Sequence, residues 1–277
     1  MVAKGECYIR QVWYKILTLS ILELVEVSIF SFFRRGLAGN VLISYPKSGR
    51  TWVRFALKLA EAPVSYNHGG YATRDPAQLG YIFKGVRPAF FGDRNVFLHR
   101  NPIDTAVSEF YQIHNRIFTP EHPKFEEMRT RLEGMNLLPP QSIDEFVLHP
   151  IWGCKKVSEF NRAHIDYFSA RSNAMVVSYE ELRTDTRAKL SDVLDFLKVK
   201  NYDIERIVSE SSFENMRRIE LNADPETKKK TALYGMRGND ENSMKVRRGK
   251  VNGYLDELKP HTVDSAKLLC LYHRISA

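Results

Sequence analysis

The chain has 277 residues, 43% of them apolar, and a formal net charge of +8 at pH 7. It is long enough to bury a full core, and it lacks the low-complexity tracts and repeats of fibrous and solenoid proteins. The positive charge suits an acidic ligand, a nucleic acid or an anionic membrane surface, so charge alone does not select among them. The three cysteines form no CxxC pair, which argues against a disulfide framework or a zinc site and favours a reducing compartment.

The N-terminal part contains an apolar run, Ile16–Phe33, of nearly the length of a membrane span. Glu23 and Glu26 lie inside it, and each carboxylate near the bilayer centre would cost about 2.5–3.5 kcal/mol. We therefore expect residues 1–36 to form an apolar helical segment that packs on the domain or contacts a membrane surface through residues 9–35, rather than an anchor. A cleaved signal peptide is disfavoured because no small-residue cleavage pattern follows, and we expect a cytoplasmic protein.

The segment Val41–Trp52 (VLISYPKSGRTW) predicts a strand, a tight loop and the start of a helix. Backbone N–H groups at such a helix N-terminus carry partial positive charge and attract phosphate or sulfate. Lys47 adds a full charge, Ser48 and Thr51 add hydroxyl donors, and Gly49 lets the backbone approach an anion closely. The alternative is an ordinary turn with a solvated lysine.

Two later apolar runs, Val96–His99 and Ala174–Ser178, have the length and charged flanks of buried parallel strands. Behind the first run, Asn101 is a natural N-cap and Pro102 is the favoured first residue of a helix. A further short strand is expected at Tyr81–Phe83.

Amphipathic helices are expected around Ile151–Phe168 and Leu190–Leu197, where apolar residues return at helical spacing. The preceding stretch, Gln112–Pro150, is rich in proline and charge and has an irregular pattern, and we expect it to be a lid or substrate-facing excursion.

Strands that alternate with helices predict right-handed βαβ crossovers and a parallel sheet. Residues 37–277 are therefore expected to form one α/β domain, with a central parallel β-sheet flanked by helices. Ligands of such sheets bind at the carboxyl ends of the strands. Lys47, Arg100 and Tyr179 each follow a predicted strand directly, so we expect them to meet at one site.

Five segments in chain order carry the strongest functional signal. They are Tyr45–Trp52, Arg100–Phe110, Tyr179–Leu182, Ser211–Met216 and Arg247–Gly253. They resemble the motifs of sulfotransferases that use 3′-phosphoadenosine-5′-phosphosulfate (PAPS) as co-substrate and release 3′-phosphoadenosine-5′-phosphate (PAP). One such motif would be weak evidence, but five in the expected order favour membership of this family.

The resemblance implies a P-loop-like nucleotide-binding fold and a role for each segment. The first holds the 5′-phosphosulfate, the second grips the 3′-phosphate, the third and fourth lie beside adenine, and the fifth closes on the 3′-phosphate. The implied donor-binding residues are Lys47, Ser48, Gly49, Arg50, Thr51, Trp52, Arg100, Ser108, Tyr179, Ser211, Phe213, Arg247, Arg248 and Gly249.

Taken singly, several of these residues have simpler interpretations. Trp52 and Phe213 are of a type usual in cores, and Arg247–Lys250 is typical of a solvated basic face. Arg50 stands where the family often has threonine, and it either assists the phosphosulfate or simply begins the helix. The resemblance favours the binding roles.

Sulfuryl transfer places growing negative charge on the bridging oxygen of the donor. Lys47 and the donors of its loop are in the right place to stabilise that charge. A sulfuryl group carries less charge than a phosphoryl group, so no metal is expected. The sequence also lacks the Gly-x-x-x-x-Gly-Lys-Ser/Thr pattern of nucleoside triphosphatases.

The acceptor hydroxyl needs a base. In cytosolic members of the family a histidine precedes the Arg-Asn-Pro motif, but the matching segment here, Lys84–Pro88, has Val86 at that place. His68, in a Gly-rich stretch, resembles the histidine of many bacterial members and is the candidate base. A surface histidine is the alternative.

Two other function classes remain open from the sequence. A P-loop kinase would share the broad fold, although the Walker pattern is missing. A non-catalytic binder of nucleic acid or membrane surfaces has charge alone in its favour, so no nucleic acid is expected as a partner. The expected acceptor is a small molecule, a lipid or a glycan, and the sequence does not determine the oligomeric state.

Overall fold

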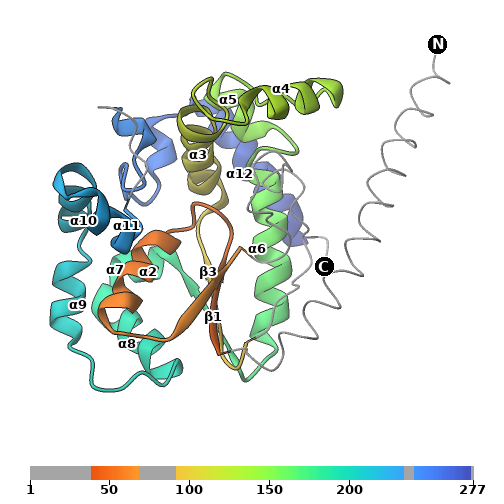
Figure 1. Ribbon diagram of the computed structural model, residues 1–277. Helices are drawn as coiled ribbons and strands as arrows, with labels where there is room; N and C mark the ends of the chain where they lie inside the picture. Colours follow the sequence, from red (N-terminus) through yellow and green to blue (C-terminus); the bar gives the residue numbers. More distant parts are fainter. Residues whose placement is uncertain (1–38, 69–91, 234–239, 276–277) are drawn as a thin grey trace, which may run out of the picture.

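The computed structural model describes residues 39–68, 92–233 and 240–275, which form a sheet covered by helices (Figure 1). The N-terminal segment 1–36 and the expected strand Tyr81–Phe83 lie outside the described residues. Within those residues, no helix combines the length and the apolar character that a membrane crossing requires.

The sheet has four parallel strands in the order β2-β1-β3-β4. The strands are β1 (Asn40–Ser44), β2 (Val64–Asn67), β3 (Asn95–His99) and β4 (Ala174–Ser178). The chain runs from β1 to one edge at β2 and then returns to β3 on the other side of β1. The carboxyl ends of β1 and β3 therefore flank a topological switch point, where parallel sheets bind ligands.

The chain also forms the following helices in order: α2 (Arg50–Leu59), α3 (Pro102–Gln112), the π-helix η2 (Ile113–Ile117), α4 (Phe125–Gly134), α5 (Ile143–Leu148), α6 (Cys154–Ser169), α7 (Tyr179–Thr184), α8 (Thr186–Phe196), α9 (Ile204–Glu210), α10 (Phe213–Asn222), α11 (Pro225–Thr231), the 3₁₀ turns η3 (Glu241–Ser243) and η4 (Gly253–Asp256), and α12 (Pro260–Ile275). The predicted helix at 151–168 begins three residues later than expected.

Helices cover both faces of the sheet (Figure 1). On one face Leu42 and Leu98 pack against α2, α7, α8 and α9. On the other face Ile43 and Phe97 pack against α6. Because neighbouring residues of a strand point to opposite faces, both sets must be apolar. This explains the continuous apolar runs from which β1, β3 and β4 were predicted.

The strand β2 was not predicted, for a physical reason. It lies at the edge of the sheet and pairs only with β1 among the described strands. Its residues Val64–Asn67 (VSYN) are exposed or half-buried, and two of the four are polar. An edge strand of this kind carries no apolar run.

Local hydrogen bonds fix the starts of two helices next to the carboxyl edge. The Asn101 side chain accepts from the N–H groups of Ile103 (2.9 Å) and Asp104 (3.3 Å), which confirms the predicted N-cap of α3. At α7, Ser178 and Glu181 form a reciprocal capping box. Both helices are thereby anchored where their strands end.

The stretch Gln112–Pro150, expected to be a lid or substrate-facing excursion, is folded into helices despite its irregular sequence pattern. This stretch contains η2, α4 and α5 and has its own core around Met128, Leu132 and Phe146. Trp152 closes that core, and its indole N–H donates to the carbonyl oxygen of Leu137 (3.2 Å). A few apolar residues at helical spacing suffice here, although charge and proline dominate the composition.

Candidate active site

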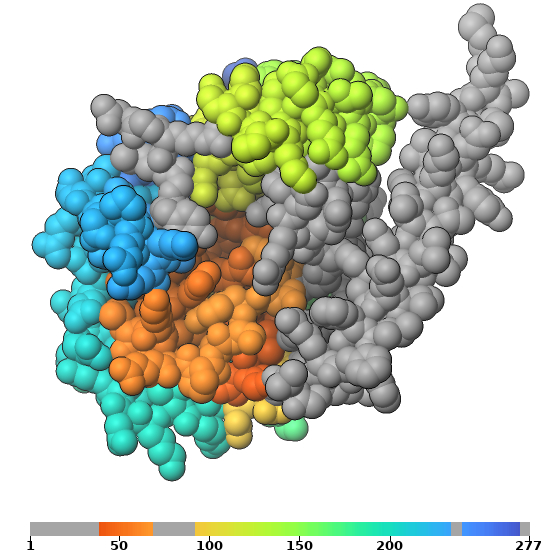
Figure 2. All heavy atoms as spheres, viewed as in Figure 1, coloured from red at the N-terminus to blue at the C-terminus, as the bar shows by residue number. Residues whose placement is uncertain are grey.

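A cavity of about 400 Å³ opens at the carboxyl ends of the strands. The surface is hollowed above α2, which is orange in Figure 2, and below the yellow-green helix α4. Loops after β1, β2 and β3 reach the cavity, as do α3, α7 and α10. The predicted site residues in its lining are Lys47, Gly49, Arg50, Thr51, Trp52, His68, Arg100, Ser108, Tyr179, Phe213, Arg247, Arg248 and Gly249.

The loop between β1 and α2 has two residues in the left-handed backbone region, Lys47 (φ 66°) and Gly49 (φ 91°). Gly49 is also the N-cap of α2, and it supplies no side-chain hydrogen bond to the helix. A backbone that enters the left-handed region in this way points successive N–H groups into a concavity, and such a concavity favours anions. The sequence prediction of an anion loop at this position therefore has the backbone geometry it requires.

Glycine is required at position 49 for a second reason. A Cβ atom at this position would lie 2.5 Å from Cδ2 of Tyr179, far inside van der Waals contact. The Tyr179 ring also meets the Trp52 ring edge to face, with centroids 5.7 Å apart. The two rings form an aromatic wall beside the loop, and Trp52 is half-buried rather than fully enclosed in the core.

The amine of Lys47 has an unusually low pKa. Burial lowers its pKa to about 7, and the positive charges of Arg116, Arg100 and Lys245 act in the same direction. The amine is therefore only partly charged near neutral pH. A bound anion would restore the charge, because an opposite charge at close range favours the ionised amine.

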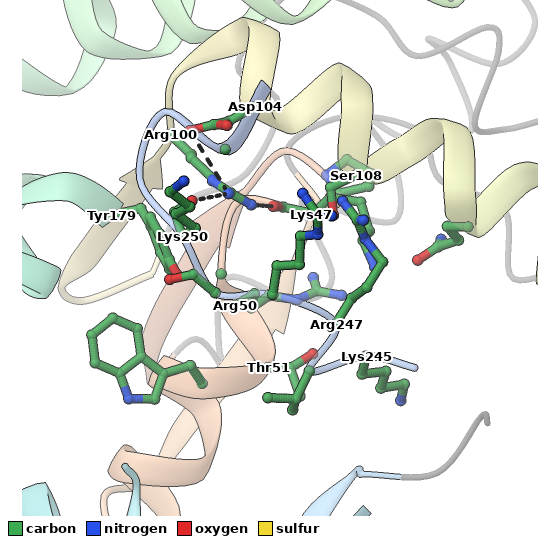
Figure 3. Close-up of a pocket in the computed structure, with 18 of the residues that line it drawn as sticks. Lys47, Arg50, Thr51, Arg100, Asp104, Ser108, Tyr179, Lys245, Arg247 and Lys250 are labelled. Carbon is green, nitrogen blue, oxygen red and sulfur yellow. Dashed lines mark hydrogen bonds and ion pairs between the residues drawn. The ribbon is translucent and has the colours of Figure 1, made fainter. Parts of the chain in front are cut away.

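Arg100 connects four parts of the site (Figure 3). Its guanidinium donates to the carbonyl oxygens of Lys47 (3.4 Å) and Lys250 (3.1 Å). It lies 3.8 Å from the Asp104 carboxylate and over the Tyr179 ring, 4.6 Å from the centroid. The predicted convergence of Lys47, Arg100 and Tyr179 is thus present in the structure.

Asp104 has a role that the sequence did not reveal. Its carboxylate accepts from the backbone N–H groups of Asn252 (2.8 Å) and Tyr254 (3.1 Å) and so ties the C-terminal loop to α3. Burial raises its pKa, although Arg100 and the two N–H groups oppose the shift. The only hint in the sequence was its place in the first turn of a helix, where acids are common for local reasons.

The loop that Asp104 holds contains the basic residues of the fifth motif. Arg247 is 15% exposed, forms an ion pair with Glu257 (2.8 Å) and lies over the Tyr111 ring at 3.9 Å. Arg248 contacts the same carboxylate at 3.3 Å. A solvated basic face is therefore the wrong description for Arg247, because its guanidinium is packed into the cavity wall.

Gly249 repeats the arrangement seen at Gly49. Its φ is 61°, and a Cβ atom would lie 2.5 Å from Cδ2 of Phe213. The Tyr179 hydroxyl donates to the Gly249 carbonyl oxygen at 3.0 Å. The Phe213 ring therefore lies on the cavity wall directly against the backbone of Gly249, where only glycine fits.

His68 follows the edge strand β2 and reaches the same cavity. Its Nδ1 lies 3.1 Å from the carbonyl oxygen of Ser44, which can only accept, so Nδ1 carries the hydrogen. Nε2 then has a lone pair, and Arg50 donates to it. The cavity thus contains a histidine nitrogen that can accept a proton, covered in this structure by an arginine.

Two predicted binding residues do not line the cavity. Ser48 and Ser211 are fully buried, and their hydroxyls have no hydrogen-bond partner among the described residues. The described lining of the cavity also has five cations that were not among the predicted binding residues, although Lys250 lies within the fifth motif. These are Arg54, Arg116, Arg183, Lys245 and Lys250.

The described residues contain no group of three His, Cys, Asp or Glu side chains arranged to hold a metal ion.

Comparison with known proteins gives a family and a fold. The family model described as "Sulfotransferase domain" matches residues 93–272. The mouse sulfotransferase SULT7A1 complexed with PAP is similar in fold, at 17% identity, with 87% of this chain and 85% of that chain covered and a TM-score of 0.55. Retinol dehydratase has a similar fold in complexes with androsterone and PAP (13%, 86% and 81% covered, TM-score 0.54) and with retinol and PAP (13%, 86% and 82%, TM-score 0.57). The comparison with curated proteins gives no match.

The contact between Gly49 and Tyr179 predicts the effect of a single methyl group. Gly49→Ala should lower the free energy of unfolding by about 1–3 kcal/mol, because the residue must keep a positive φ against the ring. Gly39→Ala is the matched control, since its Cβ would have nothing within 4 Å, and it should stay within about 0.5 kcal/mol. Urea unfolding of both variants measures the difference. Equal stabilities would show that the loop accommodates the side chain without strain.

Proposed function

The chain belongs to the sulfotransferase domain family, and we propose that it transfers the sulfuryl group of PAPS to a hydroxyl or amine of an acceptor. One observation carries the proposal: a single cavity brings Lys47 and its loop together with Arg100, Ser108 and Arg247. PAPS carries charge at its phosphosulfate and at its 3′-phosphate, so its site needs cations at two separated points. The membership suggested by the sequence motifs is confirmed.

The cavity wall has a donor group that fits an anionic nucleotide. The Nε of Arg100 is buried and has no hydrogen-bond partner among the described residues. A buried guanidinium N–H without a partner is costly, and a phosphate oxygen would satisfy it. Arg100 with Ser108 and the Gly249 backbone would hold the 3′-phosphate, and Trp52 and Phe213 would flank the adenine.

Lys47 would act on the donor's leaving group. As the bond from sulfur to the bridging oxygen breaks, negative charge grows on the phosphate. A lysine with a pKa of about 7 is readily charged by an adjacent anion and can also give up its proton. The N–H groups at the start of α2 would share this task.

His68 would act on the acceptor. Its Nδ1–H bond to Ser44 holds the tautomer in which Nε2 can take a proton from a hydroxyl. Arg50 donates to that nitrogen in the structure, so it must turn away before the base can act. A sulfuryl oxygen of the donor is a suitable alternative partner for this guanidinium.

The acceptor of the proposal is a small molecule, a lipid or a glycan. A cytoplasmic location and contact of residues 9–35 with a membrane surface remain proposals that follow from the sequence.

The assignment of the 3′-phosphate site predicts that the protein binds two nucleotides, PAP and 5′-AMP, with very different affinities. The protein should bind PAP at least about 100-fold more tightly than 5′-AMP, because each lost charge-assisted hydrogen bond costs about 1.5–3 kcal/mol. Ser108→Ala should reduce that ratio by about tenfold, whereas Ser65→Ala, on the exposed side of β2, should leave it unchanged. Isothermal titration calorimetry measures both affinities. Equal affinity for the two nucleotides would contradict the proposed function.

The pKa of Lys47 predicts a dependence of PAP affinity on pH. The amine is mostly charged below pH 7 and mostly neutral above it, and an anion such as PAP favours the charged form. Lys245 has a pKa of about 8 in the same cavity, so Lys245→Gln serves as the background for both proteins compared. Loss of the Lys245 charge raises the pKa of Lys47, so in this background the affinity should fall as the pH rises above about 7, by at most about tenfold per pH unit. Lys47→Arg stays charged and should remove the decrease; the same slope in both proteins would exclude Lys47 as its source.

The role of His68 is tested by turnover. His68→Ala should lower kcat by about 10²–10⁴-fold and leave the affinity for PAP unchanged, because a base acts on the acceptor rather than on the nucleotide. His261→Ala, an exposed residue of α12, is the matched control and should keep full activity. Full activity of His68→Ala would show that another group accepts the proton.

A further inference from the structure

Of the five cations in the described lining of the cavity that lie outside the positions assigned to the nucleotide, three lower the pKa of Lys47, of Lys245 or of both. They are Arg54, Arg116 and Lys245, and we refer to them as the second basic cluster. Arg54 belongs to α2, Arg116 to η2, and Lys245 to the loop between η3 and η4. Three separate parts of the chain therefore bring positive charge to this cavity.

Arg54 places the cluster on the side of the proposed base. It lies one helical turn after Arg50 on α2, so the two side chains share a face of the helix. Its guanidinium lies 5.1 Å from the ring centroid of Tyr66, a residue of β2. His68 follows the same strand. The acceptor of the proposed reaction has to approach from this side, where its hydroxyl or amine would meet the base.

Lys245 lies apart from the aromatic wall. In Figure 3, Tyr179 and Lys245 lie on opposite sides of Lys47. The ammonium group of Lys245 donates to the carbonyl oxygen of Ala232 at 2.7 Å, a neutral partner. Arg116 and Lys245 both lower the pKa of Lys47, so the cluster lies close to the loop that is assigned to the phosphosulfate.

The pKa values of Lys245 and Lys47 indicate that these cations lie close enough to repel one another. Burial lowers the pKa of Lys245 to about 8, and Arg116, Arg54 and Arg50 add to that shift. Lys47 is affected by Arg116 and Lys245 in the same way. A region in which cations destabilise one another attracts an anion from solution.

One buried acid, Glu220, partly offsets this repulsion, because its charge raises the pKa values of both Lys245 and Lys47. Glu220 is buried, and its carboxylate accepts from the backbone N–H groups of Lys245 (2.8 Å) and Val246 (2.9 Å). Within the described parts of the chain, the acids that line the cavity are Asp104 and Glu257. Both hold the C-terminal loop at the end assigned to the 3′-phosphate.

We propose that the acceptor carries an anionic group, a carboxylate or a sulfate, and that the second basic cluster binds it beside the accepting hydroxyl or amine. The inference rests on the proposed function and specifies the chemical class of its acceptor. Arginine pairs with either anion through two parallel hydrogen bonds, which orients as well as attracts. The same chemistry occurs in small organic acids and in acidic glycans.

Matched acceptor pairs test the proposal and distinguish these two sources. The small pair is 4-nitrophenyl β-D-glucuronide and the corresponding glucoside, and the polymeric pair is heparosan and its carboxyl-reduced form. With ³⁵S-labelled PAPS, the acidic member of at least one pair should show a kcat/KM at least about tenfold above its neutral partner. The pair that responds identifies the source of the anion.

Variants of the cluster supply the second readout. Arg54→Gln and Lys245→Gln should each lower kcat/KM for the acidic acceptor by about tenfold or more and leave PAP affinity within about twofold. Lys58→Gln is the matched control, because Lys58 is exposed one turn further along α2 and does not line the cavity. It should change neither quantity.

Three results would overturn the proposal. The first is equal turnover of acidic and neutral partners, and the second is no sulfation of any of the four acceptors by protein that binds PAP. The third is a loss of PAP affinity in Arg54→Gln and Lys245→Gln as large as their loss of turnover, which would assign the cluster to the nucleotide. Failure to bind PAP at all contradicts the proposed function instead.

Discussion

The site depends on the position of one guanidinium, that of Arg100. It holds the carbonyl oxygens of Lys47 and Lys250, lies against the Tyr179 ring and neutralises part of the charge of Asp104. Asp104 in turn binds two backbone N–H groups of the C-terminal loop. Four segments that are far apart in the sequence therefore meet at a single charged group. Its burial is expensive, and an anionic ligand that pairs with the remaining Nε–H would repay part of that cost.

Much of this arrangement could be predicted from the sequence because its signals are local. The strands β1, β3 and β4 are apolar runs, since both faces of each are covered, and the N-cap Asn101 marks the start of α3. The first three motifs follow these strands directly, so their convergence follows from the parallel sheet alone. The remaining features depend on partners distant in the chain. The two contacts of Asp104 span 148 and 150 residues, and no periodic pattern encodes them.

The features that were not predicted also depend on burial and tertiary contacts, which the local sequence does not show. Residues Val64–Asn67 form an edge strand whose exposure removes the apolar run. The helices between residues 112 and 150 bury few side chains, so charge dominates their composition. Ser48 was expected to donate to the ligand because of its residue type, but its backbone turns the side chain into the protein interior. Arg54, Arg116, Arg183 and Lys245 fall outside every binding motif, and only the fold brings them together.

The central claim is that this cavity transfers a sulfuryl group from a 3′-phosphorylated donor. The most direct measurement incubates the purified full chain with ³⁵S-labelled PAPS, a set of hydroxylated and aminated acceptors and a metal chelator, and follows both the label and PAP. The account predicts that the label moves to an acceptor with one PAP released per transfer, while the chelator has no effect. No transfer from PAPS, together with magnesium-dependent phosphoryl transfer from ATP, would contradict it and favour a kinase.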